Sequence, residues 1–500
     1  SHGVGPSAAR RLGSGVSGWR IRTDRESGAV SEPSGQCRSP GVDTPIHALF
    51  AIARPERSPR MQTNHDQGCA TASRRGLFVT YLVPTEPERS ASGIYRRQRM
   101  LTEAMAQTCD EIDILYFVQP HESNPDLRSP ARVAELLFGD FSGTLHVEIC
   151  DRMAPRRASS VWYSYLRPTT GLCRMPGYES FAGRAQVAAF ERALARRPDF
   201  VLVHRLMCMP PVLRASPPLP PLFLDLDDVE HIAFARSIAH PPRWPGRNLL
   251  YLHLPALCLG EMAALRRAHK VFVCSTTDQT RMRRLFRTGK VEVLENALPL
   301  PEPGPPGPEP QLLFLGNFGY RPNAQAAEYM LEAIWPLVYS RVPQATLILA
   351  GPDPQRVRHH ANPPPGVNFP GFVADLDALY RSAAVVVCPV RAGSGTRVKL
   401  IEAAGYAKAI VSTTLGAEGL GLRDGDDAIL RDEPAAFAQA CVDLLIDPLR
   451  ARGLGLRARE TASTRFDRKR AIARLAAWLT GAHASGHRAS REYSRPPASA

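Results

Sequence analysis

The chain has 500 residues, which is too long for one ordinary hydrophobic core and fits two domains with additional terminal segments. Hydrophobic residues make up 44% and charged residues 22%, the proportions of a globular rather than a disordered or fibrous chain. The formal net charge of +14 is concentrated at the ends, because residues 1–75 and residues 466–500 contribute +5 each and the middle only +4. This distribution argues against a basic nucleic-acid-binding surface in the body of the chain.

The cysteines and the apolar runs indicate a cytoplasmic protein. The ten cysteines are scattered without the CxxC or Cys/His spacing of a metal site, which predicts reduced thiols. The longest apolar run, residues 249–259, is too short to cross the roughly 30 Å hydrocarbon layer of a membrane. The start of the chain lacks the charged, apolar and small-residue order of a secretory signal. We therefore expect no membrane-spanning segment.

The first half of the chain has the pattern of a parallel sheet covered by helices. Residues 1–73 are rich in Gly, Ser, Pro and Arg, and we expect them to form a disordered leader. Between residues 74 and 298, short apolar runs alternate with helical stretches, which predicts an α/β domain. The expected strands are GLFVTYLV (76–83), IDILYFV (112–118), TLHVEIC (144–150), FVLVHRL (200–206), LFLDL (222–226) and KVFVCS (270–275).

A second domain of the same kind follows a proline-dense tract. Residues 299–310 (PLPEPGPPGPEP) can join neither a helix nor a central strand, so we expect a semi-rigid linker. The alternation of strands and helices then restarts and predicts a second doubly wound domain over residues 311–465. A helix over residues 466–482 is expected to brace the first domain, and residues 483–500 are expected to be disordered. The predicted fold class is α/β, with two Rossmann-like domains facing a cleft.

The segment PVRAGSGTRVKLIEAAGYAKAIVST (389–413) has the strongest chemical signal. A strand is predicted to end at its start, Gly393, Ser394 and Gly395 form a turn, and an apolar helix follows. The unpaired backbone N–H groups at the start of a helix, together with the helix dipole, favour a bound anion such as a diphosphate. Arg397 and Lys399 are expected in the first helical turn, where cations oppose the dipole, so their presence indicates a negatively charged ligand.

Glu402 lies further along the same predicted helix, where its carboxylate can accept two hydrogen bonds from a ribose diol. Each part of this pattern has an ordinary structural explanation, because GxG turns and solvated helical glutamates are common. Their combination after a strand in the second of two such domains is more specific.

In this combination the second domain resembles the family-four (group 1) retaining glycosyltransferases with the GT-B fold, over residues 311–465. Members of that family carry a Glu, seven residues and a second Glu; Glu402 matches the second, whereas Ser394 stands where the first would be. The sequence GSGTRVKLIEA resembles a subgroup with a small-residue loop. The resemblance implies that Thr396 also contributes to the donor site.

A second marker of the family is a Gly-containing loop after the first strand of the domain, with a basic residue directed toward the donor phosphates. Here it reads FLGNFGYRPNAQA (314–326), so the resemblance implies that Gly316, Asn317 and Arg321 contact the donor. Asn323 is expected to cap the following helix. Downstream, TLGAEGL (414–420) resembles another donor-side loop, in which Glu418 is either a contact or a structural cap.

The first domain resembles the family more loosely. Gly93 and Arg96 match a loop and helix that approach the donor phosphate and the acceptor, and His204 stands where a residue near the reaction centre is expected. A histidine on an apolar strand is also a common core residue. FLDLDDVEH (223–231) contains an Asp-x-Asp motif that chelates a metal in another glycosyltransferase fold. The GT-B pattern predicts no metal, and it places Asp228 at the acceptor cleft instead.

The resemblance implies transfer of a hexose from a nucleotide-diphosphate sugar to a glycan or lipid-linked acceptor, with retention, in polysaccharide or cell-envelope synthesis. Arg321, Lys399 and His204 are the expected catalytic residues. The nucleotide sugar is a co-substrate, and no cofactor is expected. The partners are the donor and the acceptor, with peripheral contact at the inner membrane face and no nucleic acid. Two alternatives stay open, a nucleotide-sugar epimerase and a noncatalytic sugar-nucleotide-binding subunit.

Overall fold

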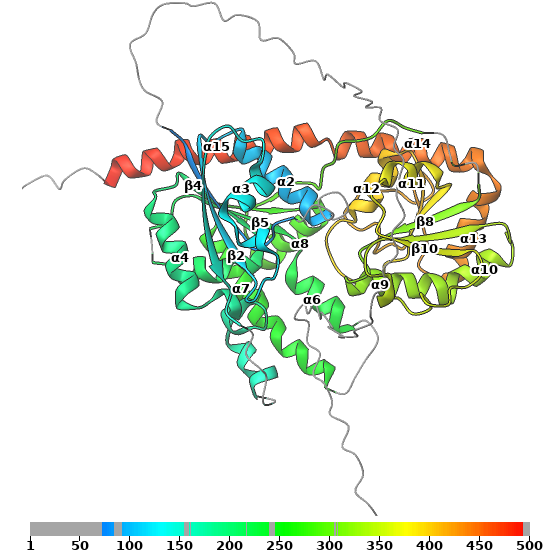
Figure 1. Cartoon of the computed structure of the whole chain (residues 1–500), viewed down its shortest axis with the longest axis horizontal. Coiled ribbons are helices and arrows are strands. Elements are labelled where there is room, and N and C mark those ends of the chain that lie inside the picture. The colour runs from blue at the N-terminus through cyan, green and yellow to red at the C-terminus, as the bar shows by residue number, and fades with distance from the viewer. Residues whose placement is uncertain are drawn as a thin grey trace, which may run out of the picture. The chain divides into compact units, whose positions relative to one another are not determined.

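The computed structural model describes residues 73–84, 93–154, 160, 162–216, 218–239, 246–304, 307 and 309–493, with side chains up to Gly481. The predicted leader, apart from its last residue, and the end of the predicted tail lie outside the described residues. The described residues form two parallel sheets with helices around them (Figure 1). This confirms the predicted fold class.

The first domain is built on a seven-stranded parallel sheet with the order β3-β2-β1-β4-β5-β6-β7. Its strands are β1 (Arg75–Thr80), β2 (Glu111–Val118), β3 (Thr144–Asp151), β4 (Phe200–His204), β5 (Leu222–Asp227), β6 (Lys270–Val273) and β7 (Val291–Val293). Its α-helices are α2 (Gly93–Ala106), α3 (Pro130–Phe138), α4 (Arg184–Ala195), α5 (Met209–Arg214), α6 (Glu230–Ala239), α7 (Leu254–Arg267) and α8 (Thr276–Phe286). The central strands β1 and β4 are almost fully buried, as expected where helices cover both faces of the sheet, whereas the edge strand β3 is only partly buried.

The second domain has a six-stranded parallel sheet with the order β10-β9-β8-β11-β12-β13. Its strands are β8 (Gln311–Leu315), β9 (Thr346–Ala350), β10 (Val367–Gly371), β11 (Val385–Cys388), β12 (Ala409–Ser412) and β13 (Ile429–Leu430). Its α-helices are α9 (Arg321–Tyr329), α10 (Trp335–Tyr339), α11 (Leu376–Ser382), α12 (Val398–Gly405), α13 (Pro434–Ile446) and α14 (Pro448–Arg465).

The strand order of each sheet reverses at one point. In the first sheet β1 lies beside β4, and in the second β8 lies beside β11, whereas the strands that follow in sequence lie on the other side. Loops that leave adjacent strands in opposite directions open a crevice at the carboxyl edge of a sheet, where ligands bind in this kind of fold. The loops after β8 and β11 are the two for which the sequence predicts donor contacts.

The chain crosses between the domains twice, and the two crossings lie together. The Leu298 amide donates a hydrogen bond to the Phe466 carbonyl over 3.3 Å, so the start of the linker lies beside the end of α14. Helix α15 (Arg468–Tyr493) follows and extends beyond the predicted end at residue 482. Its Leu475 and Leu479 are buried in the core of the first domain. The C-terminal helix therefore packs against the domain that begins the chain.

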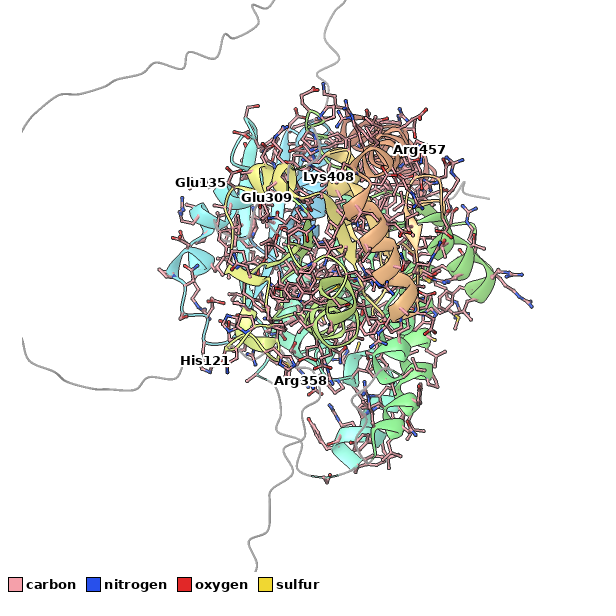
Figure 2. All side chains as sticks on the ribbon, turned by 90° about the vertical axis from the view of Figure 1, so that its right-hand side faces the viewer. His121, Glu135, Glu309, Arg358, Lys408 and Arg457 are labelled. Atoms are coloured by element: carbon pink, nitrogen blue, oxygen red, sulfur yellow. The ribbon has the colours of Figure 1, made fainter. Side chains whose placement is uncertain are left out.

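Several exposed charges of the second domain are paired locally. Arg358 forms ion pairs with Glu328 and Glu332, and Arg457 pairs with Asp426. Both arginines are labelled in Figure 2. Lys408 is different, because it is 1% exposed and its Nζ donates to the Arg381 carbonyl over 2.9 Å. It satisfies a helix end rather than facing solvent.

Among the residues that the structure describes, one helical segment is long and apolar enough to cross a membrane by length and composition alone. It comprises the 3-10 helix η7 (Arg247–His253) and α7, with a mean hydropathy of 1.3 over its best window, of which 44% is buried in the fold. Leu257, Ala264 and Leu265 on its inner face belong to the core of the first domain. We therefore treat it as a structural helix with one exposed face.

Candidate active site

The loop after β11 has the glycine-dependent conformation that the sequence predicts. Gly393 and Gly395 have φ angles of +96° and +71°, which favour glycine. Helix α12 begins later than predicted, at Val398, and Arg397 is its N-cap residue rather than part of its first turn. The Arg397 guanidinium donates hydrogen bonds to the carbonyls of Ala392 (3.1 Å) and Gly395 (3.3 Å). Arg397 thus braces the loop from within.

Lys399 lies in the first turn of α12, as predicted, and its ammonium group has only neutral partners among the described residues. Its Nζ donates to Asn323 Oδ1 over 3.0 Å and lies 4.3 Å from the centre of the Phe314 ring. Burial lowers the pKa of Lys399 to about 8. The charge of Glu402 opposes this shift, but among the described residues no carboxylate pairs directly with this half-buried ammonium group, so an anionic ligand would stabilise it. Asn323 does not cap α9 as expected, because Tyr320 is the N-cap residue.

The loop after β8 brings the other predicted cation to the same end of the sheet. Arg321 is the first residue of α9, two residues before the Asn323 that binds Lys399, and its side chain is exposed. Asn317 shapes this loop, because its Oδ1 accepts a hydrogen bond from the Gly319 amide over 2.8 Å. A Cβ at Gly316 would lie 3.0 Å from the Asn323 side chain, so glycine permits the close approach of loop and helix.

Glu402 is fully engaged by protein groups. One carboxylate oxygen forms an ion pair with Arg96 of the first domain, and the other accepts a hydrogen bond from the Tyr380 hydroxyl over 2.7 Å. Burial raises the pKa of Glu402, and the Arg96 charge opposes that shift. Nearby, a Cβ at Gly93 would lie 2.8 Å from the Val398 side chain. The start of α2 therefore packs directly on the start of α12.

Ser394 contacts Asp228 across the same interface. Its hydroxyl donates to Asp228 Oδ1 over 3.3 Å, and Arg205 donates to the other oxygen over 2.8 Å. Burial, reinforced by the charge of Asp227, raises the pKa of Asp228 to about 6. A Cβ at Gly395 would lie 2.1 Å from Asp228 Oδ1, so the glycine lets this carboxylate reach the loop backbone.

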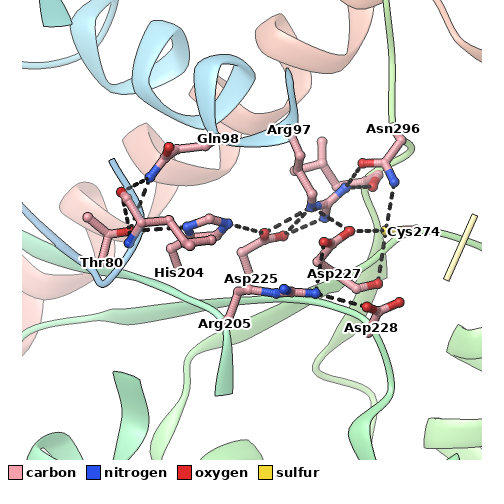
Figure 3. Close-up of polar contacts among 12 residues, drawn as sticks. Thr80, Arg97, Gln98, His204, Arg205, Asp225, Asp227, Asp228, Cys274 and Asn296 are labelled. Atoms are coloured by element: carbon pink, nitrogen blue, oxygen red, sulfur yellow. Dashed lines mark hydrogen bonds and ion pairs between the residues drawn. The ribbon is translucent and has the colours of Figure 1, made fainter. Parts of the chain in front are cut away.

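A buried charge network that the sequence analysis missed supports these contacts (Figure 3). Arg97 has no exposed side-chain surface; it pairs with Asp225 and donates to Asn296 Oδ1 over 2.9 Å. The Asn296 amide donates to Thr396 Oγ1 over 2.9 Å and so links the network to the loop of the second domain. The sequence predicts Arg96 rather than Arg97 as the site residue, and nothing in the local pattern shows which of the two is buried.

Arg205 and Asp227 end two adjacent strands in unusual backbone conformations. Their φ angles are +71° and +59°, and their side chains pair over 3.2 Å. Non-glycine residues in this region of φ are strained, and they persist only where the surrounding structure enforces the conformation. Such residues are concentrated at functional sites. Both aspartates of the Asp-x-Asp motif form ion pairs with arginines, Asp225 with Arg97 and Asp227 with Arg205. Among the described residues, no group of three or more His, Cys, Asp or Glu side chains could hold a metal ion.

His204 does not fit the catalytic role expected of it. Its side chain has no exposed surface, and its ring stacks on Phe78 with 6.2 Å between ring centres. Its Nδ1 lies 3.3 Å from the Thr80 hydroxyl, and burial, with a contribution from Arg205, lowers the pKa of His204 to about 3. A neutral ring inside the core cannot contact a substrate. His204 is therefore a core histidine, and the predicted catalytic role is wrong.

Glu418 is paired with two arginines of the first domain and also lines a cavity. Arg236 donates to both of its oxygens, over 2.7 and 3.0 Å, and Arg281 forms a further ion pair. Burial alone would raise the pKa of Glu418, but these two arginines lower it to about 2. Arg236 also donates to the Gly393 carbonyl over 3.0 Å. Glu418 thus joins the domains beside the loop instead of capping a helix.

A cavity of about 720 Å³ lies beside Glu418, between the start of α8 and the loops after β11, β12 and β13. Lys399, Glu402 and Arg321 are not among the residues that line it. Of the residues with predicted donor contacts, only Glu418 is among those that line the cavity. The cavity therefore does not include the part of the interface that carries Lys399.

Two parallel sheets of this kind, joined at their carboxyl edges by loop contacts, define the GT-B class of folds, and known structures agree. Sucrose-phosphate synthase from Thermosynechococcus elongatus is similar over 82% of this chain and 100% of its own, with 18% identity and a TM-score of 0.58. Anabaena Alr3699/HepE, in complex with UDP and glucose, is similar over 82% of this chain and 100% of its own, with 15% identity and a TM-score of 0.53.

The second domain carries the sequence similarity. Residues 309–447 match the family model of glycosyl transferases group 1. An uncharacterized 44.6 kDa protein in the cps region of Klebsiella pneumoniae is 23% identical over 140 residues, which cover 26% of this chain and 36% of that protein. The match to this curated relative thus spans about a third of its length.

Proposed function

We propose that the protein transfers a sugar from a nucleotide-diphosphate sugar to a glycan or lipid-linked acceptor. The observation that carries this proposal is the half-buried Lys399 ammonium, which lies in the first turn of α12, donates to the neutral Asn323 side chain and forms no direct ion pair with an acidic group among the described residues. The start of a helix and an unpaired cation together favour a diphosphate. The match of residues 309–447 to glycosyl transferases group 1 and the UDP and glucose of the similar Anabaena protein support the same ligand class.

The chemistry follows from where charge develops. When the bond between the anomeric carbon and the diphosphate breaks, the leaving diphosphate gains negative charge. Lys399, Arg321 and the N–H groups at the start of α12 would stabilise that charge more strongly than the charge of the intact donor, which lowers the barrier. Glu402 would accept hydrogen bonds from the ribose hydroxyls once it releases Arg96.

The acceptor would approach from the first domain, on the side of Gly93 and Asp228. Because Asp228 contacts Ser394, it lies next to the loop that would hold the donor sugar. With retention of configuration, the acceptor hydroxyl attacks from the face that the diphosphate leaves and passes its proton to the departing phosphate oxygen. No protein nucleophile is needed in that scheme. Hexosyl transfer and a cytoplasmic role in polysaccharide or cell-envelope synthesis are part of the proposal, and the Klebsiella relative in a cps region supports that role.

A panel of nucleotide diphosphate sugars tests the proposal. The melting temperature of the full chain is measured with each compound, and the compound that raises it most is then used in turnover assays with glycan and lipid-linked acceptors. We expect one class of nucleotide to stabilise the fold and its stabilisation to be reduced in a Glu402→Ala variant. Stabilisation by none of the compounds would contradict the proposal.

The same assays separate the alternatives. A nucleotide-sugar epimerase would convert the donor sugar without an acceptor, which product analysis detects. A noncatalytic binding subunit would be stabilised by the donor but would show no turnover with any acceptor. Transfer of the labelled sugar to an added acceptor is the result that we expect.

A further inference from the structure

The cavity beside Glu418 lies between the domains and apart from the proposed donor site. Thr276 and Thr277, at the start of α8, form its wall on the first domain. The loops after β11, β12 and β13, with the end of α14, form its wall on the second domain. Its volume of about 720 Å³ falls within the range of roughly 300–1,000 Å³ that is usual for small-molecule sites. The cavity, which we call the interdomain cavity, can therefore hold a ligand larger than a single ion.

Two arginines of the interdomain cavity have no anionic partner in the part of the chain that the structure describes. Arg391 follows β11, and its guanidinium lies 3.6 Å from the centre of the Tyr329 ring, which holds the group in place without neutralising its charge. Arg465 ends α14 and lies against the loop after β12, because a Cβ at Gly421 would clash with its guanidinium. Both arginines are exposed, so both can contact a ligand in the cavity.

The two carboxylates of the interdomain cavity are already held by other groups. Glu418 is paired with Arg236 and Arg281, which do not line the cavity, so the two cavity arginines outweigh the charge of Asp432. Asp432 accepts hydrogen bonds from the Thr414 amide and from the Thr414 hydroxyl group, each over 2.8 Å. Because a carboxylate has about four lone-pair positions, each of these groups can still accept a hydrogen bond from a ligand hydroxyl group.

We propose that the interdomain cavity binds a sugar monophosphate. Arg391 and Arg465 would pair with the phosphate group, since a guanidinium group can bind two phosphate oxygens at once. The carboxylates of Glu418 and Asp432 would accept hydrogen bonds from the sugar hydroxyl groups. The Thr277 hydroxyl, which has no hydrogen-bond partner among the described residues, would add a further contact. Unpaired cations beside fixed acceptors favour this ligand class over inorganic phosphate, which uses only the cations, and over a neutral sugar, which uses only the acceptors.

The interdomain cavity is separate from the proposed donor site but connected to it. Lys399 and Arg321, which would hold the donor diphosphate, do not line the cavity. Arg236 connects the two sites, because it pairs with Glu418 and also donates to the Gly393 carbonyl over 3.0 Å. A ligand held by both domains favours the state in which these contacts exist, so the sugar monophosphate would change the affinity for the donor. That change rests on the proposed function, whereas binding in the interdomain cavity does not.

Isothermal titration of the full chain tests this site without donor or acceptor, so its result is independent of the proposed transferase activity. The probes are glucose and mannose monophosphates, phosphorylated at the anomeric or at the primary hydroxyl group, with inorganic phosphate and glucose for comparison. We expect at least one hexose monophosphate to bind about tenfold or more tightly than inorganic phosphate or glucose, since it uses the cations and the acceptors together. Binding by none of the hexose monophosphates, or equally tight binding of inorganic phosphate, would overturn the proposal.

Substitution of the two cavity arginines locates the site. The double variant Arg391→Gln/Arg465→Gln should bind the same hexose monophosphate about 30-fold or more weakly, because both charge-assisted contacts to the phosphate are lost. Its melting temperature without ligand should stay close to that of the unchanged chain, because both arginines are exposed. The matched control is Arg452→Gln, which removes an exposed arginine that lies on α14 like Arg465 but does not line the cavity. We expect this control to bind like the unchanged chain.

A Lys399→Ala variant distinguishes the interdomain cavity from the donor site. This variant is needed because a sugar monophosphate is also part of a nucleotide-diphosphate sugar. Lys399→Ala should leave the affinity for the hexose monophosphate unchanged. If binding is lost in Lys399→Ala but retained in Arg391→Gln/Arg465→Gln, the ligand occupies the donor site and the proposal is wrong.

Discussion

The Arg96 guanidinium of the first domain is paired with the Glu402 carboxylate on α12 of the second domain. One Glu402 oxygen is paired with Arg96 and the other accepts from Tyr380, so a ribose diol that binds this carboxylate would compete with Arg96 for it. The ion pair therefore competes with the proposed donor and joins the domains in its absence.

This competition predicts opposite effects for the two partners of the ion pair. Glu402→Ala should weaken binding of the nucleoside diphosphate by roughly 10- to 100-fold, the value of one or two hydrogen bonds to a charged group. Arg96→Ala should strengthen it by about fivefold, because a competing pair worth about 1 kcal/mol is removed. Isothermal titration with the nucleoside diphosphate measures both. Weaker binding in Arg96→Ala would show that this guanidinium contacts the ligand instead.

Lys399 is expected to act on the transition state more than on the bound donor. Lys399→Ala should lower kcat by about 100- to 1,000-fold, the cost of removing one preorganised group that stabilises developing charge. Binding of the nucleoside diphosphate should change much less. Steady-state kinetics and titration of the same preparation separate the two effects. Lys270→Ala, which removes a lysine that pairs with Glu292 on the first domain, should leave both unchanged.

The lowered pKa of Lys399 predicts a loss of activity at alkaline pH. Because that pKa is about 8, the ammonium is charged below pH 8 and becomes neutral as the pH rises above it. The stabilisation of a leaving diphosphate is lost with the charge, so kcat/KM should fall on the alkaline side with a midpoint near 8. Lys399→Arg keeps its charge throughout this range and should remove the alkaline fall, even if its activity is lower. An unchanged alkaline limb in that variant would assign the titration to another group.

The sequence predicted the sheets well because their signal is local. Apolar runs such as those of β4 and β11 are buried on both faces, and alternation with helices specifies a parallel sheet without knowledge of distant contacts. The glycine loop before α12 was also predictable, since Gly393 and Gly395 are needed where φ is positive. Both features follow from neighbours along the chain.

The ion-pair partners of the site residues were not predictable, because they come from distant parts of the chain. Glu402, Glu418 and Asp228 were each identified as residues of the cleft, but their partners are arginines more than 20 residues away in sequence. Arg96 and Arg97 are adjacent and chemically identical, and only the tertiary fold buries one of them against Asp225. His204 shows the opposite error, because a histidine at a strand end looks the same in sequence whether the ring faces a cleft or the core.

The contact between Gly395 and Asp228 predicts a local defect. An added methyl group at Gly395 would lie 2.1 Å from the Asp228 carboxylate and would also face a φ of +71°. Gly395→Ala should therefore displace the loop and lower kcat/KM by at least about tenfold, in line with misplacement of a reacting group. Gly425→Ala is the matched control, because its φ is +78° but no atom lies within 4 Å of the added methyl. It should share the backbone strain, with a similar small drop in melting temperature, and keep its activity.

Glu418 should make the stability of the chain depend on pH in the acid range. Its pKa in the folded protein is about 2, below the ordinary value of 4.5, because Arg236 and Arg281 favour its ionised form. A lowered pKa contributes stability that is fully present above about pH 4.5 and is lost as the pH falls toward 2. Glu418→Gln removes the charge at every pH, so its melting temperature should lie below that of the unchanged chain at pH 6, and the gap should narrow from pH 4.5 to 3. A difference in melting temperature that stays constant from pH 4.5 to 3 would mean that the ion pairs of Arg236 and Arg281 with ionised Glu418 do not stabilise the fold.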